Sequence, residues 1–248
     1  MITDRFTKVR EGQGGTQAFT LIELLVIFAM MAMILSMMGP AFVKVRDKAR
    51  ELQCLNNVRN LGIAHTLYAA DHNDQLVPHS VWRPPHNGAL VPTVNMTFWP
   101  DLLQTYVGDD RIFACPCMHC DSGRGIGYGM NLQASGAFLV QSETYAVNSM
   151  EIQRPSQTVL FADAAFVTRA TMNRPLREWQ EDASRPWGCW TLRTPSDPLW
   201  HFAPARLMPR HHGRANAAFV DGHAETLTSS QLGYGLPLGH PKNCWDRH

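Results

Sequence analysis

The sequence predicts an α+β protein in which a long N-terminal helix packs on a small antiparallel β-sheet domain with long loops. Three observations predict it. Residues 24–43 carry no formal charge, apolar side chains then recur every three or four residues to about residue 70, and short β-type runs separated by turn residues follow. With 45% hydrophobic and 17% charged residues, the 248-residue chain is too apolar to be disordered.

The first 18 residues form a short polar segment that is not expected to fold. Arg5, Lys8 and Arg10 make it basic, and three glycines follow between residues 12 and 15. The segment stops abruptly at Phe19, where the apolar sequence begins. The sequence therefore divides into a leader over residues 1–18 and a helix that starts at residue 19.

Residues 24–43 are long enough to cross a membrane. As a helix, 20 residues span about 30 Å, the thickness of the hydrocarbon core of a bilayer. A cleaved secretory signal has an apolar region of only about 7–15 residues and ends in a small-residue cleavage site, so it fits less well. The sequence predicts one transmembrane helix here, and a buried helix of a soluble protein is the alternative.

Residues 19–26 read FTLIELLV and directly follow the basic leader. This segment resembles the N-terminus of type IV prepilins and type II secretion pseudopilins, in which a prepilin peptidase cuts before the phenylalanine and the new amine is methylated. The resemblance implies cleavage between Ala18 and Phe19. It places Glu23 and Pro40 where that family commonly carries the same residues, whereas Ala18 stands where the family usually has glycine.

Glu23 is a single carboxylate near the start of an apolar helix. A charge costs about 2.5–3.5 kcal/mol at the bilayer centre and less toward an interface, so such acids usually have a partner. By the resemblance, Glu23 would pair with the methylated amine of Phe19 on a neighbouring subunit and set the stagger of a filament. Alternatively, Glu23 lies at the headgroup level and stabilises the N-terminus of its own helix.

The helix is expected to continue beyond the membrane to about residue 70, with a kink at Gly39-Pro40. Basic side chains occupy other faces than the apolar ones, so this part is amphipathic. Its first half can pack among lipids or other helices, and its second half offers an apolar stripe to a folded domain. The predicted stripe consists of Val45, Ala49, Leu52, Leu55, Val58, Leu61, Ala64 and Tyr68.

Residues 71–248 are expected to form one mixed domain. Four short runs rich in β-formers predict strands at residues 137–140, 144–147, 158–162 and 217–220. Two stretches rich in proline and tryptophan, residues 82–92 and 185–209, lack periodicity. We expect them to be ordered surface loops.

A second motif lies near the C-terminus, where His211 is followed by nine residues and then by Asp221-Gly222. It resembles the H-x9-DG signature of a large family of pilin-like proteins. The resemblance covers nearly the whole chain and is looser over residues 164–209. The other segments that carry it are residues 113–116 (FACP), 127–131 (GYGMN), 154–156 (RPS) and 159–163 (VLFAD).

The same segment predicts a β-hairpin. Residues 216–220 and 223–227 are strand-like runs joined by Asp221-Gly222, a signal for a two-residue type I′ turn. On this interpretation His211 caps or hydrogen-bonds the adjacent backbone. The alternative is a metal or ligand site, because imidazole and carboxylate groups bind zinc and similar ions. Its candidate ligands are His211, His212, Asp221 and His223.

The cysteines leave three states open. The C-x-C-x2-C cluster of Cys115, Cys117 and Cys120 is dense enough for a zinc knuckle or for thiol redox chemistry. A domain outside the cytoplasm more often oxidises its thiols to disulfides, and spacing does not select the pairing. Free thiols are the third state. All six cysteines are candidates: Cys54, Cys115, Cys117, Cys120, Cys189 and Cys244, of which Cys244 could staple residues 232–248 to the domain.

Composition and motifs exclude several functions. Lysine and arginine number 22 against 21 aspartates and glutamates, which excludes a globally basic nucleic-acid binder. The chain contains no G-x-x-x-x-G-K, G-x-S-x-G or H-E-x-x-H motif, so no enzyme and no cofactor are predicted apart from the metal ion considered above. A thiol oxidoreductase that uses Cys117 and Cys120 is a weaker alternative.

These observations together predict a non-enzymatic subunit of a type IV pilus or type II secretion pseudopilus. The resemblance implies three partners: the prepilin peptidase, other pilin-like subunits and the membrane. It also implies a single-pass protein of the bacterial cytoplasmic membrane whose C-terminal domain lies outside the cytoplasm, and which reaches a filament or the cell surface after assembly. A membrane-anchored ligand- or metal-binding protein that never polymerises is the alternative.

Overall fold

The computed structural model describes residues 19–118, 125–135, 147–185, 187–197 and 199–247, except for the side chains of residues 37, 38, 40 and 41. The predicted leader with Ala18, the side chain of Pro40 and Cys120 therefore lie outside the described part. The chain divides into two compact units, residues 1–47 and 48–248, and each is described by itself. As predicted, the fold is α+β, with an N-terminal helix and a sheet.

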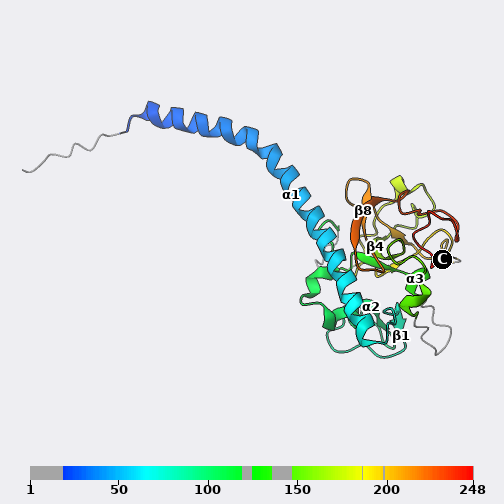
Figure 1. Ribbon diagram of the computed structural model, residues 1–248. Helices are drawn as coiled ribbons and strands as arrows, with labels where there is room; N and C mark the ends of the chain where they lie inside the picture. Colours follow the sequence, from blue (N-terminus) through cyan, green and yellow to red (C-terminus); the bar gives the residue numbers. More distant parts are fainter. Residues whose placement is uncertain (1–18, 119–124, 136–146, 186, 198, 248) are drawn as a thin grey trace, which may run out of the picture. The chain divides into compact units, whose positions relative to one another are not determined.

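Helix α1 (Leu21–Asp71) is a single 51-residue element, as expected from the sequence (Figure 1). In the first unit its apolar side chains are exposed at successive positions, from Leu21 at 79% to Leu35 at 63%. Consecutive exposed positions leave no face covered. No helix in the described part of the chain combines the length and the apolarity needed to cross a membrane, and the anchor at residues 24–43 stays a prediction.

The second unit is built around a mixed sheet, which for the described residues has six strands in the order β5-β3-β4-β7-β8, with β6 paired to β4. The sheet was expected to be antiparallel, and its other described pairings are, but β3 and β5 run parallel. The central strand β4 is buried along almost its whole length. The strands are β3 (Tyr128–Asn131), β4 (Val159–Phe166), β5 (Thr191–Leu192), β6 (Ala205–Leu207), β7 (Arg214–Phe219) and β8 (Ala224–Thr228).

Smaller elements surround this sheet. Two short strands form a separate antiparallel ladder, and two helices of four or five residues and four 3-10 helices occupy the connections. They are β1 (Ser80–Val81), β2 (Thr97–Phe98), α2 (Trp99–Leu103), α3 (Leu132–Ser135), η1 (Gln104–Tyr106), η2 (Asp110–Phe113), η3 (Ser149–Glu151) and η4 (Leu176–Glu178).

Two of the four strand predictions are confirmed. Residues 158–162 and 217–220 fall largely in β4 and β7, whereas residues 137–140 and 144–146 lie outside the described part and Val147 is not in a strand. The loop at residues 82–92 is confirmed. The prediction of a loop at residues 185–209 is wrong in part, because this segment contains the strands β5 and β6. Arg206 of β6 is fully buried and donates hydrogen bonds to the carbonyls of Trp200 and Ala203, both at 2.6 Å. Because β6 is only three residues long and includes this charged side chain, no periodic apolar pattern predicts it.

The second half of α1 covers one face of the sheet. Its buried stripe runs through Cys54, Val58, Leu61 and Ala64, at helical spacing, and packs against residues of β3, β4 and β7. The predicted positions Val58, Leu61 and Ala64 are thus confirmed. Leu52 is exposed and Leu55 only half-buried, because the stripe follows Cys54, which lies about 100° around the helix from Leu55.

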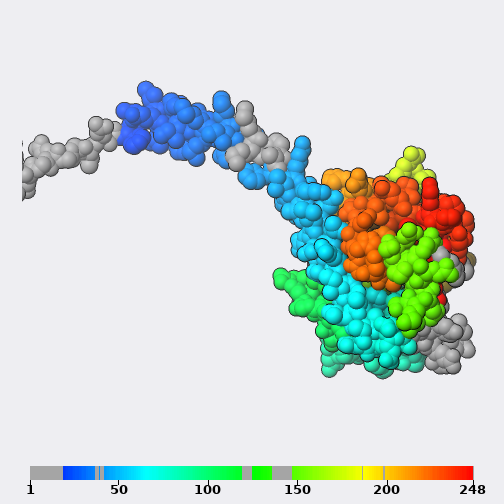
Figure 2. Space-filling model, viewed as in Figure 1, coloured from blue at the N-terminus to red at the C-terminus, as the bar shows by residue number. Residues whose placement is uncertain are grey.

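Helix and sheet approach closely at two glycines. A Cβ atom on Gly62 of α1 would lie 3.2 Å from the carbonyl oxygen of Gly222, in the β7–β8 turn. In the space-filling view the orange surface of this hairpin borders the cyan surface of α1 (Figure 2). The glycine of the H-x9-DG motif therefore lies at the contact between hairpin and helix.

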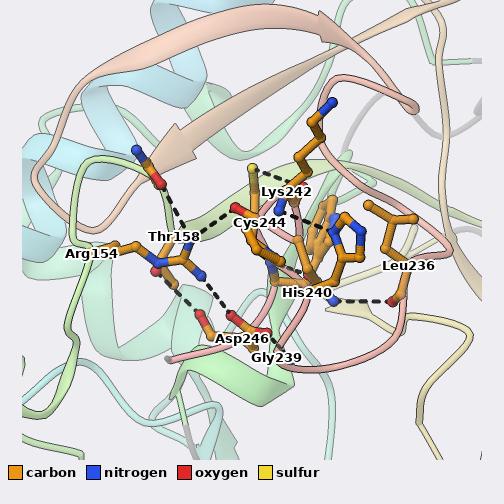
Figure 3. A network of polar contacts seen from close by, with 12 residues as sticks. Arg154, Thr158, Leu236, Gly239, His240, Lys242, Cys244 and Asp246 are labelled. Carbon is orange, nitrogen blue, oxygen red and sulfur yellow. Dashed lines mark hydrogen bonds and ion pairs between the residues drawn. The ribbon is translucent and has the colours of Figure 1, made fainter.

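The C-terminal residues cover the other face of the sheet, where the buried Trp245 and Leu232 pack with Val159 and Ala162 of β4. Asp246 holds this segment in place (Figure 3): its carboxylate accepts hydrogen bonds from the backbone of Gly239 at 2.6 Å and from Arg154 at 3.4 Å. The sequence predicted a cysteine staple here. In the structure Cys244 is a free thiol, and backbone and carboxylate contacts hold the tail instead.

Gly127 tests a close contact near the sheet. A Cβ atom there would lie 2.7 Å from both the Cβ and the backbone nitrogen of Cys115, so Gly127→Ala is expected to reduce the free energy of unfolding by about 1–3 kcal/mol. Gly108→Ala is the control, because no atom lies within 4 Å of its added Cβ. Chemical denaturation measures both, and equal effects would contradict the close contact at Gly127.

Candidate functional site

The start of α1 is a capping box. The carboxylate of Glu23 accepts hydrogen bonds from the backbone nitrogen and the hydroxyl of Thr20, both at 2.9 Å, and the Glu23 backbone donates to Thr20 Oγ1 at 3.3 Å. The T-x-x-E spacing at residues 20–23 is the sequence signal for this motif. Of the two roles expected for Glu23, the structure contains the one within its own helix, and the pairing with another subunit stays a prediction. Phe19, just before the box, is 71% exposed.

The H-x9-DG segment contains two turns of different kinds. His211 and Arg214 exchange both backbone hydrogen bonds at 3.0 Å, and the two residues between them, His212 and Gly213, have φ of 52° and 79°. Positive φ at both central residues is what a two-residue type I′ turn requires. A type I′ turn was predicted at Asp221-Gly222. The structure has a turn of this type at His212-Gly213 instead, directly before β7.

The turn at Asp221-Gly222 is a three-residue loop. Gly222 donates its backbone N–H to Phe219 at 2.9 Å and has φ of 90°, while no positive φ occurs at Asp221. This is the pattern of a type I turn followed by a left-handed glycine. Asp221 Oδ1 lies 2.5 Å from His223 Nδ1, and the His223 ring stacks on Phe219. The prediction of a hairpin was right, and its turn type was wrong.

The metal site predicted at His211, His212, Asp221 and His223 is not assembled. His211 is buried and precedes β7, whereas Asp221 and His223 follow β7, a strand of six residues that spans about 20 Å. His212 is exposed in its turn. His211 and His212 therefore lie at one end of this strand, and Asp221 and His223 lie at the other. None of the described groups that could hold a metal ion combines these four side chains, and His211 belongs to a different group.

Instead, the structure brings His211 into a buried cluster with three cysteines and Asp163. His211 Nε2 lies 3.2 Å from Asp163 Oδ2, and Cys54 Sγ lies 2.8 Å from Cys115 Sγ. Two triads each have their potential ligand atoms within 4.8 Å of one another: Cys54, Cys115 and Cys117, and Cys115, Asp163 and His211. Cys115 is common to both. The cluster joins α1, the segment after η2, β4 and the turn before β7.

Electrostatic interactions set the protonation of this cluster. Burial lowers the pKa of His211, but hydrogen bonding and attraction to Asp163 and Cys115 outweigh burial and raise the pKa to about 10. The hydrogen bond to Cys115 and burial raise the pKa of the Cys117 thiol. At neutral pH these raised pKa values favour a protonated His211 and a protonated Cys117. A metal ion would bind only if these groups lost their protons.

Arg210 adds a second buried charge next to the cluster. Its guanidinium pairs with Glu181 and donates hydrogen bonds to the carbonyls of Gly127 at 3.0 Å and Ala164 at 2.8 Å. Burial lowers the Arg210 pKa, but attraction to Glu181 and other anionic groups raises it overall. Asp163 also accepts a 2.6 Å hydrogen bond from the backbone of Asn216, so this carboxylate connects β4 to β7.

A pocket of about 670 Å³ lies elsewhere in the second unit, and the sequence did not indicate it. It is lined by the end of α1 and by the segments around β1 and α2. The Tyr68 and His72 rings stack there at 3.8 Å, and Tyr106 donates a hydrogen bond to Asp71 at 3.2 Å. Asp101, also in the lining, is buried, and burial raises its pKa.

The segments that carry the sequence resemblance meet at the buried cluster. Residues 113–116 supply Cys115, and Gly127 of residues 127–131 leaves room for it. Residues 159–163 supply Asp163, and the H-x9-DG motif supplies His211. No protein-family model matches the chain, and neither does any curated protein or solved structure. The resemblance therefore rests on these segments and on the N-terminus.

Asp163→Asn tests the buried charge pair. Near pH 6 the substitution is expected to reduce the free energy of unfolding by about 3–5 kcal/mol, because it leaves a buried cation without its partner. The His211 pKa of about 10 lies above its value near 6.5 in an unfolded chain, so the stabilisation is complete below pH 6.5. It is lost as the pH rises toward 10, and the cost of the substitution should shrink over that interval.

Asp197→Asn is the matched control for this measurement. Asp197 is also buried and pairs with Arg193 at 2.7 Å, but arginine does not titrate in this pH range. Its cost should stay constant between pH 6 and pH 10. Denaturant titrations of both variants over that interval decide the matter, and a constant cost for Asp163→Asn would contradict a charged His211.

Proposed function

We propose that this protein is a prepilin-like subunit. A prepilin peptidase cuts it between Ala18 and Phe19, and the mature chain then assembles through α1 into a filament of the type IV pilus or type II secretion pseudopilus kind. One observation carries the proposal. The segment FTLIELLV lies at the start of the 51-residue helix α1, and the part of α1 in the first unit exposes apolar side chains at successive positions.

A helix that is apolar on all faces needs an apolar environment. In the first unit, 13 consecutive positions from Val26 to Met38 contain one polar residue, Ser36, and no charge. Ser36 donates a hydrogen bond to the carbonyl of Met33 at 2.7 Å, which satisfies it within the helix. Before assembly a membrane would cover this surface, and after assembly the helices of other copies would do so.

The second unit fits the part of such a subunit that remains outside the filament core. Its sheet is covered on one face by the second half of α1 and on the other by the C-terminal residues, so it needs no partner to complete its core. We place the unassembled protein in the cytoplasmic membrane as a single-pass protein with this unit outside the cytoplasm. Its partners are the prepilin peptidase, pilin-like subunits and lipid, with no enzymatic activity of its own.

The mature N-terminus tests the processing step. Mass spectrometry of the protein purified from its native cells should find an N-methylated Phe19 as the first residue. Ala18→Gly should be processed like the wild type, whereas Ala18→Leu should keep its leader, because a bulky side chain at the cut hinders the peptidase. An intact Met1 in the wild-type protein would contradict the proposal.

Glu23→Gln separates the two roles of Glu23. Glutamine keeps the capping box but removes the charge, so the helix should start as before and processing should proceed. Filament assembly, measured as the sedimentable fraction of the mature protein, should fall at least about tenfold if the charge pairs with a neighbouring subunit, since about 1.4 kcal/mol suffices for that factor.

Thr20→Ala is the complementary variant, because it removes the hydroxyl of the capping box and leaves the carboxylate in place. It should cost the helix about 1 kcal/mol and still assemble. Wild-type assembly of Glu23→Gln, or a loss of assembly that is as large in Thr20→Ala, would show that only the cap matters.

The buried triads favour a second candidate function, a membrane-anchored metal-binding protein that does not polymerise. The raised pKa values of Cys117 and His211 weigh against it at neutral pH. Elemental analysis of the purified chain tests it, and a stoichiometric zinc content would support it. A thiol oxidoreductase would need Cys120, which lies outside the described residues.

A further inference from the structure

We propose that Cys54 and Cys115 form a disulfide bond that ties α1 to the segment after η2. This inference rests on the proposed function in one respect, the location of the second unit outside the cytoplasm. The bond would cross-link two residues that are 61 positions apart in the sequence, both within the second unit.

The positions of the two sulfur atoms carry the inference. Cys54 Sγ and Cys115 Sγ lie 2.8 Å apart, against about 2.05 Å in a disulfide. Two thiolates bound to one zinc ion lie farther apart, because Zn–S bonds of about 2.3 Å in a tetrahedral arrangement separate the sulfurs by nearly 4 Å. The observed separation is therefore closer to a covalent bond than to a shared metal ion.

The surroundings of the pair are those of a structural cross-link. Cys54 is fully buried and Cys115 is 3% exposed, and both belong to the core between α1 and the sheet. Gly127, without a side chain, leaves space for Cys115 at this point. A cross-link here joins the helix to the segment whose next neighbours are Asp163 and His211.

The other described cysteines are less suited to partner these two. Cys189 is buried, but its thiol donates to the carbonyl of Thr191 at 3.0 Å. Cys244 Sγ lies 4.0 Å from the carbonyl oxygen of Gln231 and 3.9 Å from that of Lys242. Cys117 lies within 4.8 Å of both sulfurs and is half-buried, so it is the thiol that we expect to stay reduced beside the bond.

The reaction is an ordinary thiol–disulfide exchange. The thiolate of one cysteine attacks a disulfide-bearing oxidant of the compartment outside the cytoplasm and forms a mixed disulfide. The second thiolate then displaces the reduced oxidant. The two cysteines lose two protons and two electrons, a sulfur–sulfur bond forms, and the oxidant leaves as a dithiol.

Peptide mapping of the full-length protein tests the proposal. Cells are quenched in acid, free thiols are blocked with N-ethylmaleimide in denaturant, and the purified chain is digested without reduction and analysed by mass spectrometry. The expected result is a linked peptide pair that contains Cys54 and Cys115 and separates on reduction, with Cys117 and Cys189 carrying the blocking group. Blocked Cys54 and Cys115, or a link from either to another cysteine, would overturn the proposal.

Two variants sharpen the mapping. Cys54→Ala should leave Cys115 blocked, and Cys189→Ala, the matched buried-cysteine control, should keep the link. If Cys54→Ala fails to accumulate, the wild-type map still decides. If the purified chain contains stoichiometric zinc, and if Cys54, Cys115 and Cys117 all carry the blocking group after chelation, the proposal is overturned and the three cysteines bind a metal ion instead.

The same digest reports the N-terminus, so the two proposals fail separately. A methylated Phe19 together with free Cys54 and Cys115 would refute the disulfide and leave the filament subunit standing. An unprocessed Met1 together with a linked pair would do the reverse.

Discussion

The contact between the second half of α1 and the sheet is the constraint on which the rest of the second unit depends. Leu61 and Val58 of the helix bury themselves against β4 and β7, and Gly62 allows the backbone of the β7–β8 turn to come within van der Waals distance. Because the hydrophobic effect favours the burial of all apolar side chains in this stripe, the helix determines which face of the sheet packs against it. The polar cluster around Cys115 forms where this apolar contact ends.

That cluster gives a physical reason for motifs that look unrelated in the sequence. His211 and Asp163 are far apart along the chain, yet their side chains are 3.2 Å apart in a buried position. A buried charge needs its partner, so neither residue can be exchanged alone without a large cost. The histidine that opens the H-x9-DG motif and the glycine that closes it act at opposite ends of β7, the first on a charge pair and the second on the helix contact.

Local signals in the sequence predicted several of the helices and strands. The buried cluster of cysteines, Asp163 and His211 could not be predicted in this way, because contacts between distant parts of the chain form it. The 3.6-residue periodicity of Val58, Leu61 and Ala64 revealed a helix face, and the apolar run before Asp163 revealed β4. The strands β5 and β6 are only two and three residues long, too short for any period to show. The C-x-C-x2-C spacing indicated a site built from residues that are neighbours in the sequence. In the structure, the Cys115 sulfur also lies 2.8 Å from that of Cys54 in α1, which this spacing could not predict.

The placement of the C-terminal residues affects the order in which the second unit can mature. Trp245 is buried against β4, the Cys244 carbonyl accepts a hydrogen bond from Val159 at 2.7 Å, and Asn131 of β3 donates to the Trp245 carbonyl at 2.9 Å. One face of the central strands is therefore covered only after the segment that contains Leu232 and Trp245 has been synthesised. The core on this face is completed by residues far along the chain, so it forms after β3 and β4 have been made.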